Sequence, residues 1–271
     1  MKLLLSSLLA TTMLLAAGAA SAQEFRIGLQ EDPDVLDPHK SRTFVGRLVY
    51  ASLCDKLIDV DAELKFVPRV ATDWTWNEDN TKLTFTIRDD MTFHDGTKLD
   101  AAAVAANLDR ARTLPDSLRK SELASVTAVA APDATTVVLT LAQPDATLLA
   151  QLSDRAGMLL SPATFETDLG TNPVCSGPYK FVSRVQNDRI VLEKFADHPD
   201  ADDYHFERLV FQPIPDSTVR LANLRAGDLD MLERLNPSDA AAVRDDANLQ
   251  FAPIAGLGYQ GITINTSGEG E

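Results

Sequence analysis

A short acidic stretch near residue 200 has the residue types of a metal site. His198 and His205 lie among several aspartates, Asp202 included, so imidazole and carboxylate groups that could bind a divalent ion stand close together. The stretch lacks the HExxH spacing of zinc peptidases and the glycine of a calcium loop. The pattern therefore favours a solvated acidic loop, with an exported metal-dependent hydrolase that uses these three residues as the alternative.

The rest of the chain holds no motif that demands catalysis. Neither a glycine-rich phosphate loop nor a GxSxG turn occurs. We interpret His94, beside the Asp95-Gly96 turn, as a hydrogen-bonding group of that turn rather than a base. Some of the 40 acidic residues fall close together by chance, so paired carboxylates carry no weight. We therefore predict a protein that is not an enzyme and needs no cofactor or metal.

The first 22 residues read as a secretory signal peptide. Lys2 supplies the positive start, residues 3–17 carry no charge, and Ala20-Ser21-Ala22 forms a small-residue cleavage site. The apolar run is shorter than the about 20 residues that a membrane-spanning helix needs. We expect cleavage after Ala22, a mature chain of residues 23–271 that does not insert into the membrane, and a location in the periplasm.

Export changes the interpretation of the two cysteines. Cys54 and Cys175 have no CxxC partner and no histidine at metal-ligand spacing. Outside the cytoplasm a cysteine pair usually forms a disulfide. We therefore favour a bridge between them over a catalytic or metal-binding thiol.

The charge balance excludes some partners. The chain has 40 Asp and Glu against 25 Lys and Arg, a formal net charge of -15. A general nucleic-acid binder needs a basic face, and so does a protein that docks on an anionic membrane. We therefore predict no nucleic-acid partner and no membrane-surface partner.

The spacing of apolar residues predicts mixed α and β structure. Alternation predicts strands over residues 25–29, 81–88, 137–141, 190–195, 209–211 and 259–264. Helical spacing and capping residues predict helices over residues 44–57, 100–112, 216–227 and 236–243. Because strands and helices do not alternate strictly, we expect an α/β or α+β fold with helices packed on sheets.

Seven phrases in a fixed order resemble one protein family. They are residues 36–39 (LDPH), 68–74 (PRVATDW) with Trp76, 83–88 (LTFTIR), 93–97 (FHDGT), 101–104 (AAAV), 172–181 (NPVCSGPYKF) and 224–230 (LRAGDLD). In this order the chain resembles the extracellular solute-binding proteins of the peptide/nickel (oligopeptide and dipeptide) class, family 5, which serve ABC importers. Each phrase alone is weak, but together they cover almost the whole mature chain.

The resemblance implies a fold and a function. It implies a periplasmic-binding-protein-like α/β fold (type II, class C-like) with mixed sheets and packed helices. Members have two lobes that close on a peptide or small solute, and the closed form docks on an ABC permease. Members catalyse nothing, and we expect a monomer. A subgroup carries cysteines at the positions of Cys54 and Cys175, which supports the bridge.

The resemblance also indicates where a ligand would bind. Thr43 and Phe44 follow the LDPH phrase, at the place where the first lobe of the family meets its ligand. Gly258 and Tyr259 enter the expected crossing strand, where an aromatic ring could stack on a bound chain. For Phe44 and Tyr259 plain core packing is an equally good interpretation, because aromatic side chains are mostly structural.

The chain departs from the family in length and in two loops. Family members are roughly twice as long, and residues 265–271 hold no apolar side chain, so residues 23–271 resemble a first lobe without the second. Val174-Cys175-Ser176 and Ala196–Pro199 replace other residues that are common in the family. We expect a chain of this length to bind the parental ligand weakly or not at all. A secreted interaction module without a small ligand is a further alternative.

Overall fold

The computed structural model describes residues 23–253, which belong to two compact units, Met1–Glu233 and Arg234–Glu271. In its described residues the second unit forms the short helices η4 (Pro237–Asp239) and α5 (Ala240–Arg244). The side chain of Asn236 caps this turn by accepting a hydrogen bond from the Ser238 N–H at 3.2 Å, as predicted. The strand predicted over residues 259–264 lies outside the described residues.

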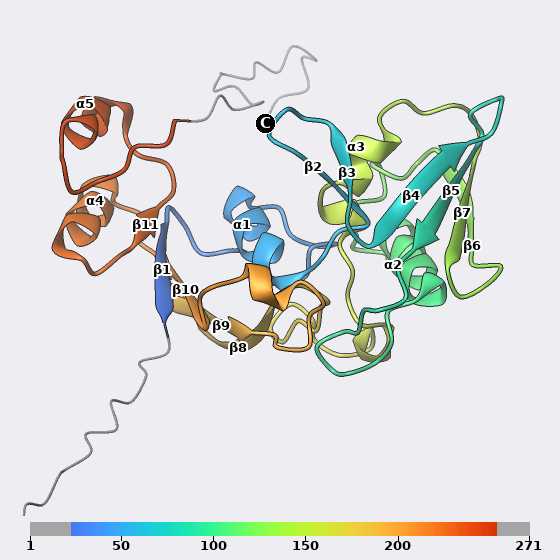
Figure 1. The fold of residues 1–271 in the computed structure, drawn as a ribbon, viewed down its shortest axis with the longest axis horizontal. Coiled ribbons are helices and arrows are strands. Elements are labelled where there is room, and N and C mark those ends of the chain that lie inside the picture. Colours follow the sequence, from blue (N-terminus) through green and yellow to red (C-terminus); the bar gives the residue numbers. More distant parts are fainter. Residues whose placement is uncertain (1–22, 254–271) are drawn as a thin grey trace, which may run out of the picture. The chain divides into compact units, whose positions relative to one another are not determined.

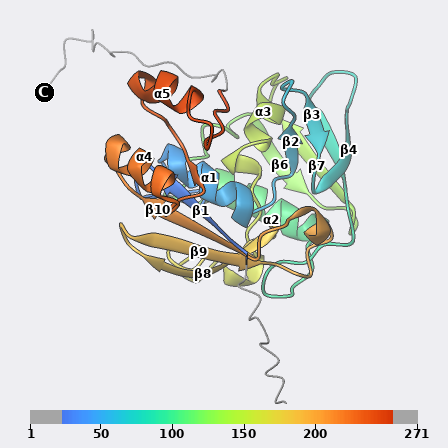
Figure 2. The ribbon, with the colours of Figure 1, turned by 60° about the vertical axis from the view of Figure 1, so that its left-hand side comes forward.

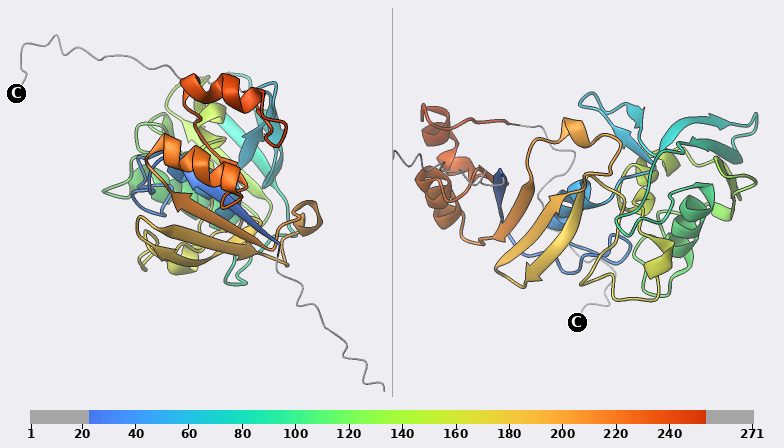
Figure 3. Two further views of the ribbon diagram at one scale, coloured as in Figure 1. Left: turned by 90° about the vertical axis from the view of Figure 1, so that its left-hand side faces the viewer. Right: turned by 60° about the horizontal axis from the view of Figure 1, so that its bottom comes forward.

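A mixed sheet in the first unit consists of five strands. They are β1 (Glu24–Leu29), β8 (Tyr179–Val185), β9 (Arg189–Lys194), β10 (Arg208–Pro213) and β11 (Met231–Leu232). Their order is β11-β1-β10-β9-β8 (Figure 1). β1 runs parallel to β10 and β11, whereas β9 runs antiparallel to β10 and β8. Figure 3 shows β8 and β9 as one long antiparallel pair.

A second sheet in the same unit is entirely antiparallel. Its strands are β4 (Ala71–Trp76), β5 (Lys82–Ile87), β6 (Val126–Ala130) and β7 (Thr136–Leu141), in the order β4-β5-β7-β6. Leu83, Phe85 and Ile87 are buried, as their alternation predicts. Apart from two helices described in the next paragraph, the remaining elements of the unit are β2 (Ile58–Val60), β3 (Phe66–Pro68), α3 (Leu148–Leu152), η1 (Arg155–Gly157), η2 (Pro162–Thr164), η3 (Ala201–Asp203) and α4 (Ser217–Ala226).

Each sheet has its own hydrophobic core and its own helix. Helix α1 (Phe44–Leu53) buries Val45, Val49 and Tyr50 in the core of the five-stranded sheet. Helix α2 (Ala101–Thr113) packs against β6 and β7 (Figure 2). None of the helices within residues 23–253 combines the length and the apolar character that a membrane crossing needs.

Two segments carry the chain from one core to the other. These segments, residues 54–57 and 157–160, lie side by side between the two cores. The Leu57 N–H donates a hydrogen bond to the Gly157 carbonyl at 2.8 Å, and the Leu159 N–H donates one to the Asp55 carbonyl at 3.0 Å. These backbone bonds make the junction a short two-stranded link rather than a loose linker.

The caps predicted for two helices are confirmed. Asp100 accepts a hydrogen bond from the Ala103 N–H at the start of α2. Asp216 accepts bonds from two N–H groups at the start of α4, and Gly227 ends that helix with a left-handed φ of 79°.

Two parts of the predicted secondary structure are wrong. Helix α1 ends at Leu53 rather than at Leu57, because Cys54 takes an extended conformation (φ -128°, ψ 123°) as the chain enters the junction. The sequence pattern also misses β2, β3, β4, β6, β8 and β11. These strands are short or, like β8, show no regular alternation of buried and exposed residues.

Candidate functional site

The segment between β1 and α1 is fixed by its three aspartates. Asp32 accepts hydrogen bonds at 2.9 Å from the Arg184 guanidinium and from a backbone N–H. Asp37 is buried and accepts one from Arg110 at 2.6 Å. Asp34 binds the start of α1, as described below. The segment is irregular, but these bonds hold it in one conformation.

Thr43 and Phe44 stand where this segment becomes helix. Thr43 is the N-cap residue of α1, yet its hydroxyl makes no capping bond and donates to Asp34 Oδ1 at 3.1 Å. Phe44 is the first helical residue, and its side chain is 45% exposed. This exposure argues against plain core packing for Phe44, and its contact with a ligand stays a prediction. Gly258 and Tyr259 lie outside the described residues.

Asp34 links Thr43 to a surface cleft. Its carboxylate accepts hydrogen bonds from the Ser41 hydroxyl at 2.8 Å and from the Arg42 N–H at 2.9 Å. Burial opposes ionisation of Asp34, but these bonds together keep its pKa below the usual value. The cleft, of about 650 Å³, is lined by Asp34, Val35, Asp168, Gly170, Thr171, Asn172, Phe181, Val182, Ser183, Arg184 and Gln186.

An arginine lies directly behind Thr43. Arg155 Nη1 donates to the carbonyl of Ser41 at 2.8 Å and to that of Thr43 at 3.5 Å. Arg119 Nη2 reaches the same Ser41 carbonyl at 3.3 Å. No motif in the sequence marks Asp34, although its partners lie only seven to nine positions further along the chain. Arg155 cannot be assigned from the sequence, because the carbonyls that it bonds lie more than 100 positions away.

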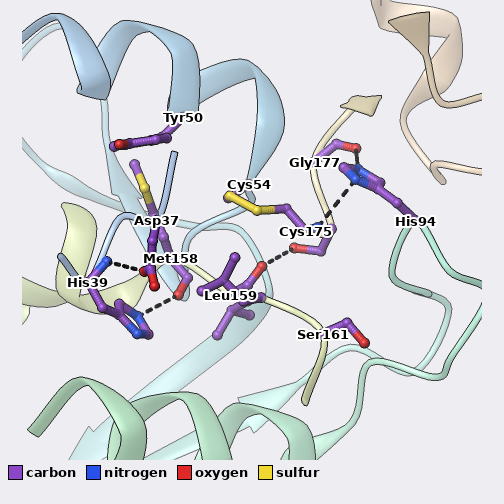
Figure 4. Close-up of a disulfide and its surroundings, with 12 residues drawn as sticks. Asp37, His39, Tyr50, Cys54, His94, Met158, Leu159, Ser161, Cys175 and Gly177 are labelled. Carbon is purple, nitrogen blue, oxygen red and sulfur yellow. Dashed lines mark hydrogen bonds between the residues drawn. A yellow bond between two sulfur atoms is a disulfide. The ribbon is translucent and has the colours of Figure 1, made fainter. Parts of the chain in front are cut away.

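The predicted disulfide is present and buried. Cys54 and Cys175 are bonded with their Cα atoms 4.8 Å apart, and they are separated by 121 positions in the sequence (Figure 4). The bridge ties the end of α1 to the segment before β8. It therefore fixes the base of the helix that begins at Phe44.

Two histidines, the buried His39 and the half-buried His94, flank the bridge in a neutral form (Figure 4). His94 Nδ1 accepts from the Cys175 N–H at 3.3 Å, so its Nε2–H donates to the Gly177 carbonyl at 2.9 Å. His39 lies between Arg110 and the Met158 carbonyl. Burial lowers the pKa of both imidazoles to about 4. His94 thus bonds residues far beyond its own turn, which corrects the local role predicted for it.

The acidic stretch near residue 200 does not form a metal site. His198 is buried, and its Nδ1 accepts from the Asp200 N–H, so its Nε2–H donates to Asp55 at 2.9 Å. The solvated-loop prediction is therefore wrong for His198, although Asp202 and His205 are exposed. Within residues 23–253, no group of three or more His, Cys, Asp or Glu could hold a metal ion.

Comparison with known families gives a match over most of the chain. The model of the bacterial extracellular solute-binding proteins, family 5 Middle, matches residues 65–269. The glutathione-binding protein GsiB of Escherichia coli O1:K1 is 28% identical over 260 residues, which are 94% of this chain and 51% of that protein. The chain thus spans about half the length of the curated relatives that it matches.

Solved structures support the same fold. The binding protein AgaA from A. tumefaciens R10, solved with agropinic acid, has a TM-score of 0.76 and 26% identity over 83% of this chain and 46% of its own. The binding protein DppA from Helicobacter pylori, solved with the peptide STSA, has a TM-score of 0.74 and 21% identity over 83% and 49%. The mixed α/β architecture is thus that of a periplasmic binding protein.

Proposed function

Because this chain belongs to the bacterial extracellular solute-binding proteins of family 5, we propose that it captures a peptide or peptide-like solute for an ABC importer. In this proposal the loaded protein delivers the solute to the membrane permease and catalyses no reaction. The family match over residues 65–269 is the observation that carries the proposal.

The ligand contact that we propose for this lobe is Thr43 with Phe44. Three features support it: the exposed ring of Phe44, the fixed segment that leads into α1, and the cleft that shares Asp34 with Thr43. An aromatic ring held on a rigid support offers a flat apolar surface at small entropic cost. Gly258 and Tyr259 remain part of the proposal as the contact from the following segment.

Further parts of the proposal concern processing and organisation. We propose a signal peptide over residues 1–22, removed after Ala22 on export to the periplasm, and a first lobe over residues 23–271. The mature protein acts as a monomer, without nucleic acid and without inserting into the membrane. The buried Cys54–Cys175 bridge agrees with an oxidising compartment. A lobe acting alone supplies one wall of a cleft, so its affinity is weak, on the order of millimolar.

Photo-cross-linking tests the proposed contact. The purified chain of residues 23–271 is irradiated with a tripeptide that carries a central benzoylphenylalanine, and the adducts are mapped by mass spectrometry. We expect adducts within residues 42–47, suppressed by an excess of unlabelled tripeptide. A tryptic map without adducts in that segment, or with adducts that no competitor suppresses, would contradict the proposal.

A further inference from the structure

The hairpin of β2 and β3 carries an apolar face that continues beyond the core (Figure 1). The strands pair antiparallel, with Ile58 opposite Pro68 and Val60 opposite Phe66. Because Ile58 and Val60 are two positions apart, they and their partners share one face of the hairpin. Ile58 is buried in the core, whereas Val60 is 37% exposed and Phe66 36% exposed. The apolar face therefore runs from the core into solvent toward the turn.

The turn of this hairpin presents a leucine to solvent. Leu64 is 56% exposed, the largest fraction of any large apolar side chain within residues 23–253. Its φ is 61°, in the left-handed region that bulky side chains rarely adopt. The Asp61 carbonyl accepts from the Leu64 N–H at 3.0 Å, and the Asp61 carboxylate accepts from the N–H groups of Glu63 at 3.0 Å and Lys65 at 2.8 Å. These bonds hold Leu64 in its left-handed conformation.

Folding alone favours another residue type at position 64. In two other hairpins of the chain the left-handed turn residue is an asparagine, Asn80 between β4 and β5 (φ 55°) and Asn187 between β8 and β9 (φ 59°). Asparagine and glycine adopt this conformation at the lowest cost. Leu64 strains the backbone and buries little apolar surface in return. Strain of this kind is typical of functional positions, so we look for a partner that covers the leucine.

The exposed side chains of Val60, Leu64 and Phe66, which we call the hairpin tip, are too few for a stable dimer. A standard stable interface buries about 800 Å² per partner, far more than three partly exposed side chains offer. Two copies of a chain with a net charge of -15 would also repel each other. The tip instead suits a brief contact with a receptor, in which a few buried side chains supply most of the affinity.

The charges around the tip favour a protein receptor over a lipid surface. The side chains of Asp61 and Glu63 are negative and outnumber the positive Lys65 in the turn. Behind them Asp59 and Lys56 neutralise each other in an ion pair. An anionic lipid surface would repel this negative excess, whereas basic side chains of a protein would attract it. The complementary surface is therefore an apolar pocket with a basic rim.

We propose that the hairpin tip docks this lobe on the permease of the importer, with Leu64 entering an apolar pocket that is rimmed by basic side chains. This inference rests on the proposed function, in which the loaded protein delivers its solute to that permease. The base of the hairpin is fixed at the junction, where the Ala71 N–H donates to the Leu57 carbonyl at 2.8 Å. A contact held on so rigid a base loses little conformational entropy on docking.

Binding to the reconstituted importer tests the inference. The probe is the cognate permease with its ATPase subunits in phosphatidylcholine nanodiscs, immobilised for biolayer interferometry with the chain of residues 23–271. We expect saturable binding that Leu64→Asn weakens at least about 10-fold, because the pocket loses its apolar occupant. The same substitution should raise the midpoint of urea unfolding, since asparagine adopts the left-handed conformation more readily. Loss of docking together with a gain in stability is a result that a structural role of Leu64 would not produce.

Matched controls separate the tip from general surface effects. Val185→Asn removes a valine that is 51% exposed beside the turn of the β8–β9 hairpin, and it should leave docking unchanged. Phe66→Ser, on the tip, should weaken docking as Leu64→Asn does. Empty nanodiscs that contain phosphatidylglycerol should bind no protein, and the parent chain should sediment as a monomer at 0.5 mM.

Each failure has its own meaning. If the parent and Leu64→Asn bind the importer equally, the inference is wrong and the proposed delivery to a permease stands. A urea midpoint that falls in Leu64→Asn would show that the leucine serves the fold, which also overturns the inference. Binding to empty nanodiscs, or dimers, that Leu64→Asn abolishes would assign the tip to a lipid surface or to a second copy. If the parent does not bind the importer, the inference and the proposed delivery are both wrong.

Discussion

Acid should destabilise the protein through His39 and His94. Both imidazoles use one nitrogen as acceptor: His39 Nδ1 faces an Arg110 N–H at 2.8 Å, and His94 Nδ1 faces the Cys175 N–H. A second proton on either imidazole would sit on Nδ1 and point at the N–H group that donates to it. The hydrogen bond would be lost, and two donors would face each other. In the folded protein the pKa of each histidine is therefore about 4, whereas in the unfolded chain it is 6.5.

The size and sign of the effect follow from these values. Between pH 6.5 and pH 4 these two histidines are protonated in the unfolded chain but stay neutral in the folded protein. The free energy of unfolding is therefore highest above pH 6.5 and falls as the pH drops. From pH 7 to pH 5 each histidine accounts for about 2 kcal/mol, and the pair for about 4 kcal/mol as an upper limit.

Urea unfolding at pH 7, 6 and 5, with the disulfide intact, measures this loss. This range lies above the titration of most carboxylates. His94→Gln keeps a donor for the Gly177 carbonyl and removes one titrating group, so the slope should fall to about half. His205→Gln, an exposed control, should leave the slope unchanged. A free energy of unfolding that is flat from pH 7 to pH 5, or equal slopes for His94→Gln and the parent, would refute the reasoning.

Three further predictions concern stability. Reducing the Cys54–Cys175 bridge, which closes a loop of 121 positions, should lower the free energy of unfolding by about 5 kcal/mol in urea titrations. Asp216→Ala should cost about 1 kcal/mol by removing the α4 cap. Gly177→Ala should lower the thermal midpoint, since its Cβ would lie 2.7 Å from the backbone of Leu53. Unchanged stability in any variant contradicts that prediction.

Local signals made part of the fold predictable. The alternation of Leu83, Phe85 and Ile87 predicts β5, and Asp216 with Gly227 brackets α4, because these elements depend on neighbours a few positions apart. Strand β8 was missed because an edge strand buries few side chains in a regular pattern. Helix α1 ends where Cys54 turns into the junction, whose backbone bonds come from residues 157–160, far along the chain.

The site was predictable only in outline. Thr43 and Phe44 follow a recognisable phrase, and the structure places them at the exposed start of α1. Arg155 and His198 could not be assigned, because their surroundings are built by partners more than 100 positions away. The sequence alone does not show whether the fold will bury a given arginine or histidine side chain.

The affinity of a Phe44→Ala variant for a tripeptide tests the central claim most directly. The Phe44 ring is 45% exposed, so its removal should leave the fold intact, while a ligand that covers it loses about 1 kcal/mol of apolar contact. Native mass spectrometry of the chain of residues 23–271 with trialanine should show a 1:1 adduct in the millimolar range, weakened roughly 5-fold to 10-fold in the variant. An adduct of equal strength in parent and variant would contradict the account.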